Sequence, residues 1–132
     1  SVSMINFTRK PRYGYEDLLE IIRLLRSPEG CPWDRVQTHQ SIRRGMLEEA
    51  YEAAEAIDTE NTTLLQEELG DVLFAAVKAA RFAGVDPEDA LNAACEKFIR
   101  RYGAVEQGAR DRGVSVSDLT LEEMTGLWNA AK

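Results

Sequence analysis

The sequence is poor in cysteine and histidine, the residues that build disulfide frameworks and zinc sites. Its 132 residues include two cysteines, Cys31 and Cys95, and a single histidine, His39. Two cysteines without a CxxC pattern do not make a disulfide scaffold, so we expect reduced thiols, with Cys95 buried as a small apolar side chain in a helix. One histidine excludes a multi-histidine zinc site and a ferritin-like di-iron bundle, which needs two Glu-x-x-His motifs.

A surplus of basic residues and a long apolar run are also missing. The formal net charge is −7 and the pI is about 4.8. We therefore expect no nucleic-acid partner, because phosphate backbones need a basic surface. A phosphorylated small molecule would need a cation to bind beside the acidic residues. No run of about 18 apolar residues and no signal-peptide pattern is present, so we expect no membrane span and a cytoplasmic location.

No segment shows the alternation of a half-buried strand, which predicts an all-α fold. Helical periodicity predicts helices over residues 16–26, 40–57, 63–83 and 87–112. Thr120 and Glu123 form a capping box for a short C-terminal helix that ends near Ala131. Gly84 and Pro87 mark a helix end and a helix start. These segments predict a four-helix bundle with a short C-terminal helix.

Length and composition suit one domain with one core. Apolar residues make up 44% and charged residues 30% of the chain, an ordinary globular balance. We assign residues 15–132 to this domain and residues 1–14 to an irregular lead-in that contains Pro11 and Gly14. Long amphipathic helices in one small domain leave apolar faces over, so we expect a homo-oligomer.

Two acidic clusters stand out in the second and third predicted helices. They consist of Glu48, Glu49, Glu52, Glu67, Glu68 and Asp71, with a predicted turn over residues 58–63 between them. Residues three apart share a helix face, so Glu49 pairs with Glu52 and Glu68 with Asp71. In an antiparallel hairpin the facing residues match in height to within about one residue's rise of 1.5 Å. The spacing therefore predicts four carboxylates, Glu49, Glu52, Glu68 and Asp71, across one helix seam.

Carboxylates that converge in this way resist ionising together unless a cation joins them. A hard divalent ion with oxygen ligands, Mg²⁺ or Mn²⁺, suits the set. The alternative is an ordinary solvated acidic face. Helical wheels place Glu49 and Glu68 at the rims of apolar stripes, where desolvation favours a metal. The stripes are Met46, Ala50, Ala53, Ala54 and Ile57 on one helix and Leu65, Leu69, Val72, Ala76 and Ala80 on the other.

Several motifs together resemble the MazG family of nucleoside triphosphate pyrophosphohydrolases. They are CPWD at residues 31–34, QTH at 37–39, LEEAYE at 47–52, EELGDVL at 67–73, EKFIRR at 96–101 and the ending from LEEM at 121–124 to Trp128. The resemblance covers residues 15–132. It implies an all-α pyrophosphohydrolase fold, usually a homodimer or a larger assembly such as a homotetramer. It also implies Mg²⁺-dependent cleavage of nucleoside triphosphates between the α- and β-phosphates, in which Mn²⁺ is a possible substitute.

The resemblance also implies roles for individual residues. Glu49, Glu52, Glu68 and Asp71 match the metal ligands, and Glu48 and Glu67 match neighbouring acidic positions that position or deprotonate water. The catalytic candidates are thus Glu48, Glu49 and Glu67. Lys97 and Arg101 match a basic pair that contacts phosphates, and Trp128 matches an aromatic residue that contacts the nucleotide. At Gly45 and Leu64, where some members carry basic residues, this sequence departs from the pattern.

Other interpretations of the basic and aromatic residues stay open. Lys97 and Arg101, four apart on one helix face, also suit a solvated basic patch at a helix end. Trp33 and Trp128 can stack on a nucleobase, or can serve as core or interface anchors.

The leading hypothesis is a general nucleoside triphosphate pyrophosphohydrolase that clears unwanted nucleotides. Two other functions are also compatible with the sequence. A related enzyme would act on a narrower substrate, phosphoribosyl-ATP or a pyrimidine deoxynucleoside triphosphate. A helical interaction module would have no catalysis, and its acidic seam would bind Mg²⁺ or a basic partner. The CPWD loop and the C-terminal motif favour the MazG interpretation, and the complete set of four acidic positions favours activity.

Overall fold

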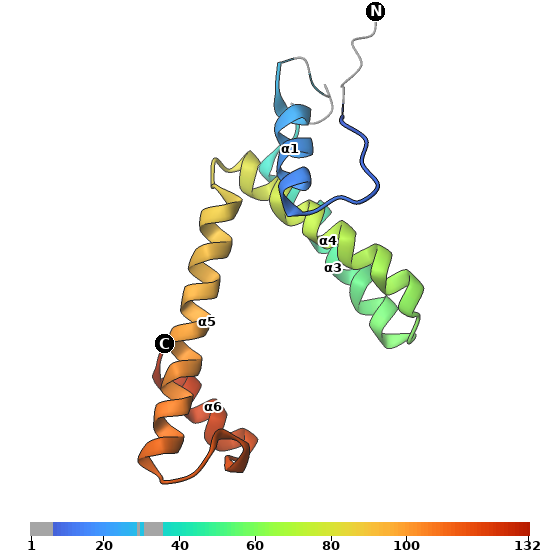
Figure 1. Cartoon of the computed structure of the whole chain (residues 1–132). Helices are drawn as coiled ribbons and strands as arrows, with labels where there is room; N and C mark the ends of the chain where they lie inside the picture. The colour runs from blue at the N-terminus through green and yellow to red at the C-terminus, as the bar shows by residue number, and fades with distance from the viewer. Residues whose placement is uncertain (1–6, 29, 31–35) are drawn as a thin grey trace, which may run out of the picture. The chain divides into compact units, whose positions relative to one another are not determined.

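The computed structural model describes residues 7–28, 30 and 36–132 (Figure 1). This part of the chain is helical and contains no strand, so the predicted all-α class is confirmed. The elements are α1 (Tyr15–Arg26), α3 (His39–Asp58), α4 (Thr62–Phe82), α5 (Pro87–Asp111), a 3-10 turn η1 (Val116–Asp118) and α6 (Leu121–Ala130). None of the helices in the described residues has the length and apolarity needed to cross a membrane.

The helix ends follow local capping chemistry. Thr38 caps α3 by accepting a hydrogen bond from the backbone N–H of Ser41, and Asn61 caps α4 in the same way through Leu64. Thr120 and Glu123 form the predicted capping box of α6. Only residues 59–61 separate α3 from α4, so the connection is shorter than predicted.

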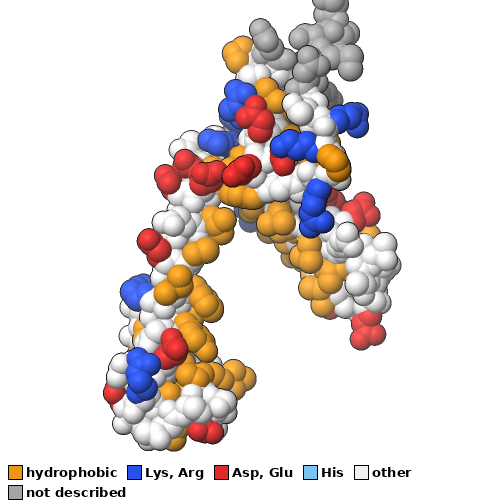
Figure 2. Space-filling model, in the orientation of Figure 1, with side chains coloured by type: hydrophobic (Ala, Val, Ile, Leu, Met, Phe, Trp, Pro, Cys, Tyr) orange, Lys and Arg blue, Asp and Glu red, His pale blue; other side chains and the backbone are white. Residues whose placement is uncertain are grey.

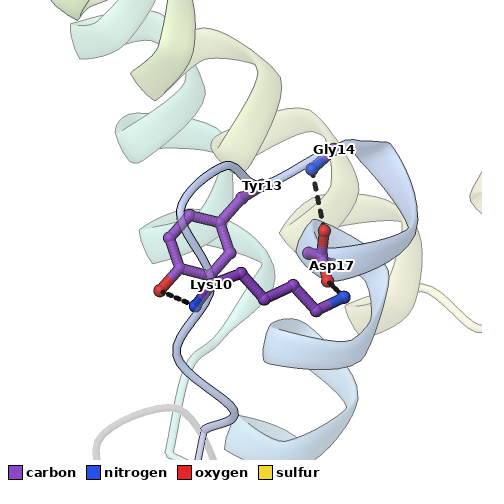
Figure 3. Close-up of polar contacts among 4 residues, drawn as sticks. All are labelled: Lys10, Tyr13, Gly14 and Asp17. Atoms are coloured by element: carbon purple, nitrogen blue, oxygen red, sulfur yellow. Dashed lines mark hydrogen bonds and ion pairs between the residues drawn. The ribbon is translucent and has the colours of Figure 1, made fainter.

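Hydrogen bonds from the segment before α1 fix the start of that helix (Figure 3). The Asp17 carboxylate accepts a bond of 2.8 Å from the Gly14 backbone N–H and pairs with the Lys10 ammonium at 2.5 Å. The bond from Lys10, followed by that from Gly14, lowers the pKa of Asp17 below its usual value. A negative charge in the first turn also suits the helix dipole.

The chain divides into two compact units, residues 1–87 and 88–132. In the first unit, Leu19 and Ile22 of α1 form a core with Val77 of α4. Ala53 and Ala56 are the buried residues of α3, which runs alongside α4 (Figure 1). Small side chains on a helix allow a close approach of its neighbour, which bears on the site below.

The second unit has its own core where α5 and α6 meet. Val105, Ala109 and Leu119 are buried there, and Leu127 and Trp128 pack against them. A Cβ atom on Gly108 would lie 2.5 Å from Cδ2 of Leu127, so this glycine permits the contact between the two helices. The domain boundary predicted at residue 15 lies within the first unit and stays a prediction.

Several predictions of burial were wrong. Leu69, Met46 and Ile57 were expected in apolar stripes but are 47%, 41% and 58% exposed. Ala53 is buried as predicted, and the fold also buries Ala56 of α3 and Glu68 of α4. Cys95 on α5 is exposed as well, although it was expected to be buried.

Candidate metal centre

The hairpin of α3 and α4 brings three of the four predicted metal ligands together. Carboxylate oxygens of Glu49 on α3 and of Glu68 and Asp71 on α4 all lie within 4.8 Å of one another. Two features of the sequence favour this geometry. The three-residue connection between α3 and α4 sets the register of the two helices, and the buried residues of α3 are the small Ala53 and Ala56.

Burial makes this cluster unusual among acidic groups. Glu68 is only 8% exposed, although carboxylates rarely leave water without a partner. The Oε2 atoms of Glu49 and Glu68 are buried and have no hydrogen-bond partner. An unpaired buried carboxylate oxygen is costly, and a divalent cation bound by oxygen ligands removes that cost. The donor set therefore fits a hard ion such as Mg²⁺.

Burial and mutual repulsion both raise the pKa values of the cluster. The pKa of Glu68 rises to about 7, first because of burial, then because of a hydrogen bond with Glu52 and the charges of Glu52 and Asp71. The pKa of Glu49 is also raised, again mainly by burial and then by the neighbouring acidic charges. A bound cation would reverse this tendency, because it favours the ionised form of each ligand.

The remaining acidic residues lie around this cluster. Glu52 is exposed and hydrogen-bonds with Glu68, but it is not one of the three residues within the 4.8 Å group. Glu48 and Glu67 are exposed on the same two helices, and their charges help to raise the pKa values of Glu49 and Glu68 respectively. Of the three catalytic candidates, Glu49 thus belongs to the cluster, and Glu48 and Glu67 each lie next to one of its members.

A cleft of about 230 Å³ opens beside the cluster. Its lining includes Glu49 and Asp71, Gln37 of the QTH motif, and two polar residues outside all the predicted motifs, Ser41 and Lys78. The spacing of charged residues along α4 could have pointed to Lys78. Lys78 follows Asp71 by seven residues, which is two helical turns, so both project from one face.

The second unit contains three of the four predicted substrate-binding residues, Lys97, Arg101 and Trp128. The Arg101 guanidinium lies 5.6 Å from the centre of the Trp128 ring, a cation–π contact. Phe98 packs on the same ring at 5.5 Å. Lys97 is exposed on α5, and Trp33 lies outside the described residues. The structure thus brings Arg101 and Trp128 together.

Comparisons with known proteins agree with these features. The model of the MazG nucleotide pyrophosphohydrolase domain matches residues 37–105. The chain is 47% identical over 92 residues to the nucleoside triphosphate pyrophosphohydrolase/pyrophosphatase MazG of Thermotoga maritima, a match that covers 67% of this chain and 36% of that protein. It is 42% identical over 82 residues to the nucleoside triphosphate pyrophosphohydrolase of Escherichia coli K12, with 62% and 30% covered.

A solved structure extends the likeness to most of the chain. The crystal structure of a mazG-related protein from Thermotoga maritima superimposes with a TM-score of 0.62 at 31% identity, and the match covers 88% of this chain and 96% of that chain. The chain spans 36% or less of the length of the two curated relatives named above. From the family match and the shared fold, we conclude that this chain belongs to the MazG nucleotide pyrophosphohydrolase domain family.

Proposed function

We propose that this domain hydrolyses ribo- or deoxyribonucleoside triphosphates between the α- and β-phosphates, using Mg²⁺, for which Mn²⁺ can substitute. The products are a nucleoside monophosphate and pyrophosphate. The observation that carries the proposal is the pair of buried carboxylate oxygens on Glu49 and Glu68 without hydrogen-bond partners, beside Asp71. The relatives from Thermotoga maritima and Escherichia coli are named nucleoside triphosphate pyrophosphohydrolases, which supports the same reaction.

Each acidic residue has a role in this proposal. Glu49, Glu52, Glu68 and Asp71 hold the metal, with Glu52 joining the three converging residues. When bound, Mg²⁺ neutralises phosphate charge and lowers the pKa of a coordinated water. Glu48 or Glu67 would accept a proton from the attacking water, because both are exposed and lie beside members of the cluster.

The bonds and charges of the reaction balance without a further reactant. The water oxygen bonds to one phosphorus of the α–β anhydride, and the bond from that phosphorus to the bridging oxygen breaks. The proton passes to a glutamate and then to solvent. Lys97 and Arg101 would balance the negative charge that develops on pyrophosphate. Trp128 and Trp33 would contact the nucleobase by stacking.

The proposed setting follows from the substrate. Nucleoside triphosphates are held in the cytoplasm, so we propose that the domain acts there and clears unwanted nucleotides from the pool. We also propose that residues 15–132 form the catalytic domain, preceded by a lead-in over residues 1–14.

Exposed apolar side chains support a homodimer or a homotetramer as the working form. Hydrophobic side chains line α5 and the hairpin of α3 and α4 (Figure 2). On α5 they include Leu91, Phe98 and Ile99, which are 50%, 55% and 68% exposed. Monomeric soluble proteins rarely expose apolar side chains that are gathered in one large patch. Sedimentation equilibrium would measure the assembly, and a monomer at micromolar concentration would contradict it.

A nucleotide panel with product identification tests the reaction. We expect monophosphate and pyrophosphate in the presence of Mg²⁺, and no turnover with EDTA or with Glu49→Gln. Diphosphate and orthophosphate would reject the reaction. Turnover of phosphoribosyl-ATP alone, or of one pyrimidine deoxynucleotide alone, would identify a narrower enzyme. Binding of Mg²⁺ without turnover of any nucleotide would identify a non-catalytic helical module.

A further inference from the structure

We propose that Lys78 binds the phosphate chain of the substrate and supplies the positive charge of the cleft beside the metal cluster. The proposal rests on the proposed function and adds a substrate-binding residue to it. Lys78 lies outside all the motifs that identified the family, and its assignment comes from the cleft alone. The ligand class is an oligophosphate that carries a divalent cation.

Lys78 lies on the same face of α4 as the cluster residue Asp71. Asp71, Ala75 and Lys78 are spaced by four and three residues, so they follow one face of the helix along the cleft. Two turns of helix separate Asp71 from Lys78, a rise of about 10 Å. A phosphate chain that is held at one end by a cation on Asp71 can therefore reach the Lys78 ammonium along the same face.

The charges of the side chains that line the cleft also suit a phosphate chain with a bound cation. Among the described residues that line this cleft, Glu49 and Asp71 are the acidic side chains and Lys78 is the one basic side chain. A nucleoside triphosphate carries more negative charge than one Mg²⁺ ion neutralises. The acidic end of the cleft thus requires the metal, and the end at Lys78 provides a cation that belongs to the protein.

The walls of the cleft strengthen the interaction. Ile42, Met46 and Phe74 contribute apolar surface to the lining, and Lys78 is itself half-buried. Charges interact more strongly in such surroundings than in bulk water, because the local dielectric constant is lower. A lysine suits this task, since its ammonium is a compact charge on a flexible stem and binds phosphate as a point charge.

Removing the charge of Lys78 should weaken the binding of the nucleotide without weakening the binding of Mg²⁺ alone. Lys78→Met removes the charge and keeps an unbranched side chain. We expect roughly tenfold or greater weakening of the binding of an α,β-methylene nucleoside triphosphate with Mg²⁺, because a charge-assisted hydrogen bond is lost. Binding of Mg²⁺ alone should be unchanged or tighter, because a repelling positive charge has been removed from the cleft. Isothermal titration calorimetry measures both.

Two further variants separate binding from structural support. Lys78→Arg should retain nucleotide binding within a few-fold. Lys10→Met is the matched control, since Lys10 lines a different cleft of about 260 Å³ and pairs with Asp17; it should leave both affinities unchanged. If Lys78 served only to stabilise the acidic cluster, Lys78→Met would lower the melting temperature and leave nucleotide affinity intact, which would overturn the proposal.

A rescue experiment uses the facing helix. Gly45 of α3 lines the same cleft, and a Cβ atom added there would meet nothing within 4 Å. Gly45→Lys in the Lys78→Met background should recover much of the nucleotide affinity, because it returns a cation to the cleft. Nucleotide affinity that is already intact in Lys78→Met, so that Gly45→Lys has nothing to restore, overturns the role of Lys78.

The two proposals fail in distinguishable ways. If the native protein hydrolyses nucleotides and Lys78→Met binds the analogue equally well, only the assignment of Lys78 is wrong. If no nucleotide is hydrolysed but analogue binding depends on Lys78, the proposed reaction is wrong and the binding site stands. If the native protein neither hydrolyses nucleotides nor binds the analogue, both are wrong.

Discussion

The two units of this chain depart from the rule of apolar residues inside and charged residues outside in opposite ways. The hairpin of the first unit buries a glutamate, Glu68, at 8% exposure. The long helix of the second unit leaves Phe98 and Ile99 more than half exposed. A buried carboxylate favours a cation, and an exposed apolar helix face favours another protein surface. Each departure thus indicates the chemistry of the ligand that would complete it.

The largest effect is expected from neutralising the buried carboxylate. Glu68→Gln should reduce pyrophosphate release roughly a thousandfold, because a metal ligand supplies several kcal/mol of transition-state stabilisation. The same change should leave the metal-free fold at least as stable at pH 8, since it removes a buried charge. Steady-state kinetics and thermal unfolding in EDTA measure the two effects.

Glu55→Gln is the matched control for that variant, because Glu55 is exposed on α3 outside the cluster. It should leave both kinetics and stability unchanged. Full activity of Glu68→Gln would show that the Glu68 carboxylate is not a catalytic metal ligand. The acidic residues of the hairpin would then be an ordinary acidic surface.

The next effect concerns the apolar face of α5. Phe98→Glu should weaken self-association about thirtyfold or more, because an aromatic anchor that an interface buries typically contributes about 2 kcal/mol or more. Ala93→Glu introduces the same charge five positions earlier, on a different face of the helix, and should have a small effect. Sedimentation equilibrium over a range of concentrations compares the two variants. Equal association of both would show that this face contacts no partner copy.

A pH dependence should distinguish the hairpin from the second unit. Because the folded pKa of Glu68 is raised from 4.5 to about 7, the folded state holds this proton more tightly than the unfolded chain. The contribution of Glu68 to the stability of the metal-free protein should therefore be greatest below pH 4.5. It should fall as the pH rises to about 7. Mg²⁺ affinity should rise over the same interval, since binding releases the proton.

Denaturant titrations at several pH values in EDTA measure this dependence. Glu68→Gln should flatten the curve between pH 5 and about 7. A fall in stability that persists unchanged in this variant would assign the titration to another group.

The smallest effect compares one substitution in the two units. Gly70→Ala on α4 should stabilise the protein by about 0.5–1 kcal/mol, because a Cβ atom there meets nothing within 4 Å and alanine favours helix. Gly108→Ala on α5 should destabilise by about 1 kcal/mol, since its Cβ would displace Leu127 and overpacking outweighs the helix preference. Urea unfolding compares them, and equal signs would contradict the packing described for α5 and α6.

Helix positions were predictable because their signals are local. Thr120 with Glu123 and the pair Gly84 and Pro87 each mark a boundary through one or two residues. Gly84 indeed adopts the left-handed conformation, with φ 73°, just after α4 ends. Such signals depend on the chain within a few residues and therefore survive in the fold.

The buried faces were harder to predict. A helical wheel places Leu69 in the core because it treats apolar residues as directed inward, yet Leu69 is half exposed and Glu68 is buried. The register of α3 against α4 decides this, and periodicity alone does not contain it. The cleft around Lys78 was not predictable for the same reason, since residues from two helices line it.

The connection between α3 and α4 has a consequence for how sequences of this kind can change. It has only three residues, and Glu60 within it adopts a left-handed conformation with φ 55°. One inserted residue that extended α4 would rotate Glu68 and Asp71 by about 100° and shift them by about 1.5 Å relative to Glu49. An insertion that lengthened α4 in this way would thus separate Glu68 and Asp71 from Glu49 even if every carboxylate were kept.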